Sequence, residues 1–308
     1  MRILCTGGSG FLGSHIVDLL VEKGIDTYVL KSGYRSNNHP DVVNKEATVI
    51  RGNLLNPVEV DVATQNMDMV FHCGAVLSHY ADLYPELAFD VNVKGTWNLK
   101  KACKQNNVQR IIYASTSFVY GDPTTVPVNE NSPLNPKGNF EVGKLAAEKI
   151  LQAVHPCQVP YTILRLFNMY GPRSYPDGVY SQATTTFILA ALKGLSIEVH
   201  ADGKQELDFV YVKDAAKAFI DCISEKAENK IFNVGSGTST SINNLAMSIN
   251  LLTNNKAGIH YNTAHPPYLK TVQADITSIK QQVGWTPKTS WMQGLKETVE
   301  FFKEWTQQ

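Results

Sequence analysis

A glycine-rich turn near the start of the chain constrains its fold more than any other feature. The turn, Thr6-Gly-Gly-Ser-Gly-Phe-Leu-Gly13, follows the short apolar run Ile3–Cys5 and precedes apolar residues at helical spacing that end at Gly24. Such glycines permit a tight turn and let the backbone approach a pyrophosphate, which then meets the N–H groups at a helix N-terminus. A flexible turn would also be rich in glycine, but the position between a strand and a helix predicts a site for NAD or NADP. The predicted contacts are Gly7, Gly10, Phe11, Leu12 and Gly13.

Apolar, strand-like runs alternate with helix-compatible stretches over the first half of the chain. This alternation is typical of βαβ units, so we expect a Rossmann-type doubly wound parallel sheet with a smaller C-terminal substrate lobe. The expected dinucleotide-binding domain spans residues 1–170, and residues 171–308 form mainly the lobe, with some segments returning to the sheet. The strands are expected at Thr27–Leu30, Thr48–Arg51, Met69–Cys73, Arg110–Ala114, Tyr161–Phe167 and Ile231–Val234, and helices at Asp214–Ser224 and Trp291–Trp305.

Composition argues against several classes of function. Lys+Arg and Asp+Glu are 28 each, which gives no general electrostatic reason to bind nucleic acid or an anionic membrane. The 5 cysteines include no CxxC pair and the 8 histidines show no ligand spacing, so we expect neither a disulfide framework nor a metal site. No apolar run reaches the length of a membrane span, and we expect a cytoplasmic protein.

The end of the second expected strand bears on the choice between NAD and NADP. NAD-binding proteins usually present a carboxylate there to the adenosine ribose. This chain has Lys31 and Arg35 and no carboxylate in that stretch, which favours NADP because cations pair with its 2′-phosphate. A solvated basic loop is the alternative.

Several ordered motifs together resemble the extended short-chain dehydrogenase/reductase family, and within it the nucleotide-sugar epimerases and dehydratases. The resemblance runs over nearly the whole chain and implies cofactor contacts from Asn53 and Leu54 and from Gly74 and Ala75. The matching segments are residues 6–13 (TGGSGFLG), 52–54 (GNL), 72–75 (HCGA), 92–96 (NVKGT), 114–121 (ASTSFVYG), 165–173 (RLFNMYGPR) and 208–212 (DFVYV).

The same resemblance implies a catalytic Tyr four residues before a Lys on one helix face, with a Ser or Thr from a nearby strand end. The Lys is Lys144, which also contacts the cofactor, and the hydroxyl is assigned to Thr116, but the tyrosine position is Phe140. Phenylalanine has no proton to give or take. A deliberate Tyr→Phe substitution, a natural protein without catalysis, and the use of another acid/base remain open.

The residues after Thr116 bear on the type of reaction. Dehydratases of the family typically have Asp-Glu there, and decarboxylases have a Glu two places on. This chain has Ser117 and Phe118, which favours an epimerase or a reductase over elimination or decarboxylation.

The substrate end of the sequence matches the family only in part. Asn168 matches the position that binds the substrate phosphate region, but Leu207 and His265 stand where two arginines usually grip the diphosphate. Either other cations such as Arg173, Lys204 or Lys270 compensate, or the ligand is not an ordinary nucleotide sugar. His79, Thr116, Ser117, Asn168 and Arg173 are the expected substrate contacts.

Three functions remain open from these residues. The first is an NAD(P)-dependent epimerase of a nucleotide-linked sugar, acting through a transient keto intermediate. The second is an NADP-dependent carbonyl reductase of a non-nucleotide or unusual sugar substrate, and the third is a non-catalytic NADP-binding sensor or scaffold. The resemblance further implies a homodimer formed through helices near Asn92–Cys103 and Phe140–Ala153.

Overall fold

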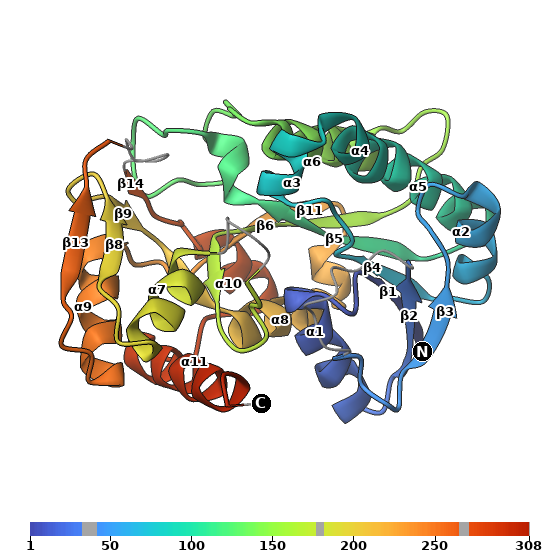
Figure 1. Cartoon of the computed structure of the whole chain (residues 1–308). Helices are drawn as coiled ribbons and strands as arrows, with labels where there is room; N and C mark the ends of the chain where they lie inside the picture. Colours follow the sequence, from blue (N-terminus) through green and yellow to red (C-terminus); the bar gives the residue numbers. More distant parts are fainter. Residues whose placement is uncertain (33–41, 177–181, 265–270, 308) are drawn as a thin grey trace.

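A parallel sheet of 7 strands forms the centre of the protein, with the strand order β3-β2-β1-β4-β5-β6-β11 (Figure 1). The computed structural model describes residues 1–32, 42–176, 182–264 and 271–307, apart from the side chain of residue 79. The order reverses between β1 and β4, which is the point where open α/β sheets bind their ligands. The strands are β1 Arg2–Thr6, β2 Asp26–Lys31, β3 Thr48–Arg51, β4 Met69–His72, β5 Arg110–Thr116, β6 Tyr161–Leu166 and β11 Lys230–Val234.

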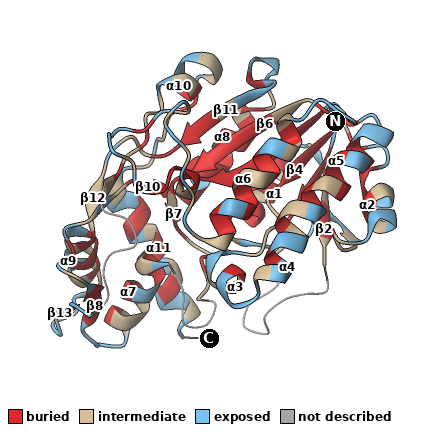
Figure 2. Cartoon of the chain, turned by 90° about the horizontal axis from the view of Figure 1, so that it is seen from above, coloured by how far each residue is buried: buried red, intermediate tan, exposed pale blue. Residues whose placement is uncertain are grey.

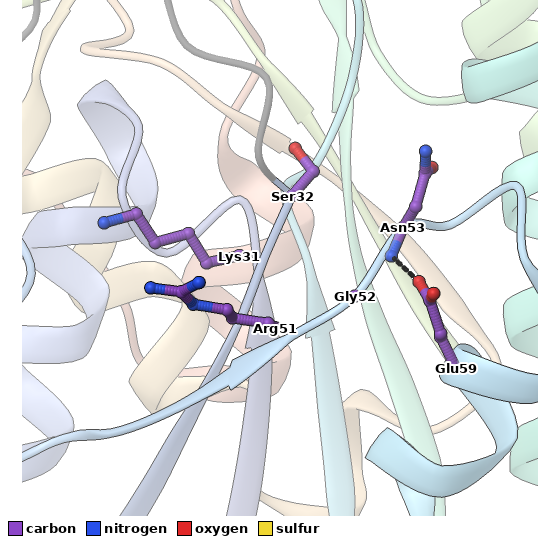
Figure 3. A pocket seen from close by; sticks show the side chains of 6 residues that line it. All are labelled: Lys31, Ser32, Arg51, Gly52, Asn53 and Glu59. Atoms are coloured by element: carbon purple, nitrogen blue, oxygen red, sulfur yellow. Dashed lines mark hydrogen bonds between the residues drawn. The ribbon is translucent and has the colours of Figure 1, made fainter.

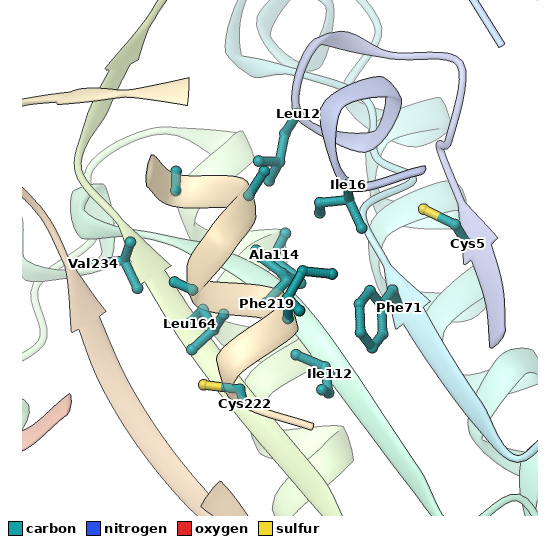
Figure 4. Close-up of a cluster of buried hydrophobic side chains, with 14 of the residues drawn as sticks. Cys5, Leu12, Ile16, Phe71, Ile112, Ala114, Leu164, Phe219, Cys222 and Val234 are labelled. Carbon is teal, nitrogen blue, oxygen red and sulfur yellow. The ribbon is translucent and has the colours of Figure 1, made fainter. Parts of the chain in front are cut away.

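Helices cover both faces of this sheet, because successive strand residues point to opposite sides. Ile3 and Cys5 of β1 pack with α1 and α8, whereas Leu4 packs with α2, α5 and α6 on the other face. Figure 4 shows the first of these clusters, in which side chains from α1 and α8 meet those of the strands. The helices are α1 Phe11–Glu22, α8 Val212–Asp221, α2 Pro57–Thr64, α5 Thr96–Gln105 and α6 Asn139–Gln152.

A further hydrophobic core lies in the C-terminal half, and Figure 1 shows the elements that form it beside the central sheet. Its helices pack together and against the parallel pair of β8 with β13. Three short strands form a further small sheet, and β7 pairs with β10 next to the end of β6. These elements are α7 Ala183–Leu192, α9 Ile242–Thr253, α11 Trp291–Trp305, β8 Ile197–His200, β13 Ile259–Asn262, β9 Glu206–Leu207, β12 Thr240–Ser241, β14 Thr271–Val272, β7 Asn168–Tyr170 and β10 Phe209–Tyr211.

Three segments of the C-terminal half return to the central sheet. Strand β11 extends it beside β6, α8 packs on α1, and α10 (Thr277–Val283) contacts β11. The Rossmann-type fold expected from the alternating pattern is confirmed. Several strand boundaries differ from expectation by one to two residues; β4, for example, ends at His72 and β6 at Leu166. The helix expected at Asp214–Ser224 begins two residues earlier and ends three residues earlier, as α8.

Short helices follow β4 and lead into α5, on the face that also carries α6 (Figure 2). They are α3 Ser78–Leu83, α4 Pro85–Phe89 and a π-helical turn over Asp90–Gly95. Two 3₁₀ turns lie at Ser117–Tyr120 and Glu225–Ala227. Among the described residues, no helix is long and apolar enough to cross a membrane.

Candidate active site

The glycine turn joins β1 to α1 with almost no spare space. Gly7 has a φ of +69°, and a Cβ on it would lie 2.7 Å from the backbone nitrogen of Gly74. A Cβ on Gly13 would lie 2.1 Å from the carbonyl oxygen of Gly7. Helix α1 begins after Gly10, and in the described residues no side chain caps it. The backbone N–H groups at the start of α1 are therefore free of side-chain caps in the described residues, and pyrophosphate binding by the turn stays a prediction.

A chain of hydrogen bonds with a fixed direction supports the loop after β4. The Thr96 hydroxyl donates to the Asn92 carbonyl at 2.7 Å, so it accepts from Nε2–H of His72 at 3.0 Å. Nδ1 of His72 is then the acceptor and receives the Thr6 hydroxyl proton at 2.7 Å. The Thr6 oxygen in turn accepts the Gly74 N–H at 3.1 Å. These hydrogen bonds require a neutral His72. Burial lowers the pKa of His72 to about 3, and the charge of Lys144 lowers it further.

The side chain of Asn92 also holds the loop after β4, through two hydrogen bonds to the backbone of Val76. Its Oδ1 accepts from the Val76 N–H at 2.8 Å, and its Nδ2 donates to the Val76 carbonyl at 2.9 Å. Together with Thr6, these contacts hold the loop that contains Gly74 and Ala75 between the glycine turn and the π-helical turn before α5. Cofactor contacts from Gly74 and Ala75 stay a prediction.

A pocket of about 400 Å³ opens where β2 and β3 end, and Figure 3 shows the side chains that line it. Lys31 and Arg51 are register partners on these parallel strands and extend in the same direction. On the other side of the pocket, Glu59 of α2 accepts the Asn53 N–H at 2.7 Å. Arg35 lies outside the described residues.

Glu59 corrects one part of the sequence interpretation. That interpretation found no carboxylate near the end of β2, but α2 supplies one from further along the chain. The Asn53 side chain also helps to shape this wall, because its Oδ1 accepts the Leu55 N–H at 2.9 Å. Leu54 is buried, and its carbonyl accepts from the side chain of Asn98 at 2.9 Å.

Lys144 and Phe140 lie one turn apart on α6, which packs against β5 and its end at Thr116. The Lys144 ammonium lies 4.1 Å from the ring centroid of Tyr113, and burial lowers the pKa of Lys144 to about 7. The Thr116 hydroxyl accepts the Phe118 N–H at 3.3 Å, so its own proton remains available to a ligand. Thr116, Phe140 and Lys144 thus lie on two elements that pack against each other, and their catalytic roles stay predictions.

Phe140 is buried in a small apolar cluster. Its ring packs with Ala81 and Ala88, and Val76 and Phe118 flank the cluster. This cluster connects α6 to α3 and α4, next to the end of β5. Position 140 therefore has an apolar environment that accommodates an aromatic ring.

A buried ionic network supports this part of α6. Glu148 binds Arg165 of β6 through two hydrogen bonds of 2.8 and 3.1 Å, and it also accepts the Ser115 hydroxyl. Arg165 continues to the Tyr120 hydroxyl at 3.0 Å, which donates to Asn233 of β11 at 2.6 Å. The network joins α6 to three strands and fixes the helix that carries Lys144.

The expected substrate residues are spread over the boundary between the sheet and the C-terminal half. The Asn168 side chain donates to the Asp208 carbonyl at 3.4 Å, at the start of β7. Arg173 forms a 2.7 Å ion pair with Asp18 of α1. Ser117 is buried beside Thr116. His265 and the side chain of His79 lie outside the described residues.

Comparison with known proteins identifies the relatives of this chain. Residues 3–235 match the NAD dependent epimerase/dehydratase family. The chain belongs to this family. It is 32% identical to a UDP-N-acetyl-alpha-D-glucosaminuronate decarboxylase of Bacillus cytotoxicus over 98% of both chains.

Solved structures of family members superpose closely on this one. The UDP-glucose 4-epimerase of Thermotoga maritima, solved with UDP-glucose, is 29% identical and has a TM-score of 0.93 over 99% of this chain and 100% of the other. A Tyr-to-Phe mutant of the UDP-glucuronic acid 4-epimerase of Bacillus cereus, solved with NAD and a UDP-4-deoxy-4-fluoro-glucuronic acid, is 25% identical with a TM-score of 0.89 over 99% and 100%.

The sequence analysis did not predict three residues that lie near the candidate site. Arg51 was assigned only to a strand, and its pairing with Lys31 depends on the register of β2 and β3. Tyr113 stands in an apolar run, which gives no sign that its ring faces Lys144. Glu59 could have been noticed as an acidic residue in the first turn of the helix that follows Asn53.

Proposed function

We propose that this protein is an NAD(P)-dependent epimerase of a nucleotide-linked sugar that acts through a transient keto intermediate, with Phe140 in the position of the proton-transferring tyrosine. The observation that carries the proposal is that α6, with Phe140 and Lys144, packs against β5, which ends at Thr116, and against the loop after β4. The relatives described above include epimerases and a decarboxylase of UDP-sugars.

Each residue of the group has a separate task in this proposal. The Thr116 hydroxyl orients the reacting hydroxyl of the sugar, and the Lys144 ammonium binds the ribose next to the nicotinamide. A bound dinucleotide supplies the hydride acceptor. Phe140 fills the space of a tyrosine without its oxygen, so the chain binds both ligands but lacks one proton-transfer group. His79 and Asn168 are assigned to the substrate.

The direct test restores the missing oxygen. In Phe140→Tyr, we expect epimerase activity with a panel of UDP- and dTDP-sugars to rise by roughly 10²–10⁴-fold, the usual contribution of general acid–base catalysis. Thr116→Val in the restored background should lower kcat again, since it removes the orienting hydroxyl. The proposal fails if the restored protein gains no activity with any sugar while it still binds the dinucleotide.

Epimerisation is favoured over decarboxylation by the residues at the end of β5. Phe118 is partly buried against two apolar clusters and carries no carboxylate for proton handling. Ser117 is buried in the 3₁₀ turn that follows Thr116. Restored protein should therefore release no CO₂ from UDP-glucuronic acid.

One observation favours the reductase as a second candidate. Leu207, which stands where the family places a diphosphate-binding arginine, packs its side chain against two apolar clusters. A reductase consumes NADPH and lowers the nicotinamide absorbance, whereas an epimerase turns over without a net change. A protein that binds NADPH and does neither, before and after Phe140→Tyr, would be the sensor or scaffold.

The cofactor preference and the oligomeric state belong to the same proposal. The Lys31–Arg51 pair favours NADP, although the Bacillus cereus mutant described above was solved with NAD. We also propose a homodimer through the helices near Asn92–Cys103 and Phe140–Ala153, because Tyr84 and Leu87 of the adjoining segment are exposed. Light scattering should give twice the chain mass, and a single-chain mass would contradict the dimer.

A further inference from the structure

We infer that Tyr113 is a positioning residue for Lys144, whose charged ammonium it holds against its ring face at the cofactor site. The inference rests on the proposed role of Lys144 toward the ribose of the dinucleotide. Tyr113 belongs to neither the glycine turn nor the group of Thr116, Phe140 and Lys144, and it lies in the middle of an apolar strand.

The geometry is that of a cation–π contact in a dry environment. Nζ of Lys144 lies 4.1 Å from the centroid of the Tyr113 ring, and only 3% and 1% of these two residues are exposed. An aromatic face attracts a cation within about 6 Å of its centroid, and more strongly where water is excluded. Tyr113 therefore compensates part of the solvation that Lys144 loses.

Burial has the largest effect on the pKa of Lys144 and lowers it, whereas the electrostatic effects of Cys73 and Glu148 raise it, so the ring of Tyr113 acts beside these two groups. From β4 and its end come His72, which the hydrogen-bond chain keeps neutral, and the thiol of Cys73. From α6 comes Glu148, whose two carboxylate oxygens are engaged by Arg165 and Ser115. From β5 comes Tyr113 itself, whose pKa is raised by burial, so that it remains a neutral phenol.

The hydroxyl of Tyr113 makes no contribution of its own. Its oxygen is buried and has no hydrogen-bond partner in the described part of the chain. An unpaired buried hydroxyl is normally a cost to stability. The proposed role of Tyr113 therefore depends on its ring. Tyr113→Phe is a matched control, because it keeps the ring and removes the unpaired oxygen.

The consequence is a dependence of cofactor binding on pH. Loss of the ring face makes the charged form of Lys144 less favourable, which lowers its pKa further. As the pH rises, the ammonium that binds the ribose is then lost earlier. The basic limb of the binding curve should move to lower pH, with little change where Lys144 is still charged.

The experiment measures NADH affinity by fluorescence titration from pH 6 to 9.5. Wild type and Tyr113→Phe should share one midpoint, whereas Tyr113→Leu should move it down by about one pH unit, the size of a buried cation–π contact. At pH 8 this corresponds to a loss in affinity of up to about tenfold. In a Lys144→Met background, Tyr113→Leu should not change the pH curve further.

A second variant covers the case in which Tyr113→Leu does not fold. Incorporation of 3,4,5-trifluorophenylalanine at position 113 keeps the shape of the ring and weakens its negative face, so it should shift the midpoint in the same direction relative to Tyr113→Phe. Superimposable curves for these two variants would overturn the inference. If wild type binds no dinucleotide at any pH, both the inference and the proposed function fail. If the midpoint shifts but Phe140→Tyr stays inactive, only the proposed function fails.

Discussion

Removal of the two cations in the pocket at the ends of β2 and β3 should change cofactor selectivity. Lys31 and Arg51 are register partners and extend to the same side of that pocket. A hydrogen bond to a charged group contributes about 1.5–3 kcal/mol, and the lower end applies here because Arg51 is exposed and Lys31 is partly so. Since 1.4 kcal/mol is a factor of ten, Lys31→Met and Arg51→Met should each weaken NADPH about tenfold, and the double variant about 100-fold.

The assay compares the Kd values of NADPH and NADH by fluorescence titration at two ionic strengths. NADH affinity should stay within about twofold, since NADH lacks the 2′-phosphate that the cations would bind. Glu59→Gln should strengthen NADPH binding, because it removes a negative charge from the same pocket. Lys101→Met, an equal charge change on the exposed side of α5, is the control. Equal losses for both cofactors would refute the assignment of the pocket to a 2′-phosphate.

Three further predictions concern the framework of the site. Gly13→Ala should abolish dinucleotide binding, because the new Cβ would lie 2.1 Å from the backbone oxygen of Gly7. Gly143→Ala is the control, since its Cβ would have no neighbour closer than 3.5 Å, and the free energy of unfolding should rise by up to about 1 kcal/mol. Equal dinucleotide binding by the two variants would contradict this prediction. In chemical denaturation, Glu148→Gln should lower the free energy of unfolding by about 3–5 kcal/mol, because it leaves the buried Arg165 without its ionic partner. Lys137→Ala, which breaks an exposed ion pair, should lower it by less than about 1 kcal/mol. Burial lowers the pKa of His72 to about 3, so between pH 6.5 and 3 the histidine is protonated in the unfolded state and neutral in the folded state. The free energy of unfolding should therefore fall by up to about 1.4 kcal/mol per pH unit as the pH drops through this range. A His72→Gln variant should lose that slope in denaturation measured across this range, and an unchanged slope would count against the neutral histidine.

The sequence predicted the parts of the site that depend on neighbouring residues. The glycine turn needs only a strand, three glycines and a helix in succession, and the structure has them at the expected place. Lys144 and Phe140 share a helix face because residues four apart always do. The strand expected at Arg110–Ala114 is present as β5, which runs two residues further, to Thr116. Motifs of this kind carry their geometry in their spacing.

Contacts between residues far apart in the sequence could not be predicted from local spacing. Lys31 and Arg51 are 20 positions apart, and the strand register alone makes them neighbours. Glu59 supplies a carboxylate to a pocket that the β2 sequence had indicated to be purely basic. Arg173, expected at the substrate, instead pairs with Asp18 across more than 150 positions, and its substrate role stays a prediction.

The sequence by itself determined that a glycine turn opens a parallel α/β sheet and that Phe140 stands one helical turn before Lys144. These facts are local, since they depend on residue type and short-range spacing. The tertiary structure decided what surrounds them: a neutral His72 fixed between two hydroxyls, and a Lys144 ammonium buried against an aromatic ring. The physical reason is that the protonation state and the desolvation of a group depend on every element packed around it, and those elements come together only when the helices pack on the sheet.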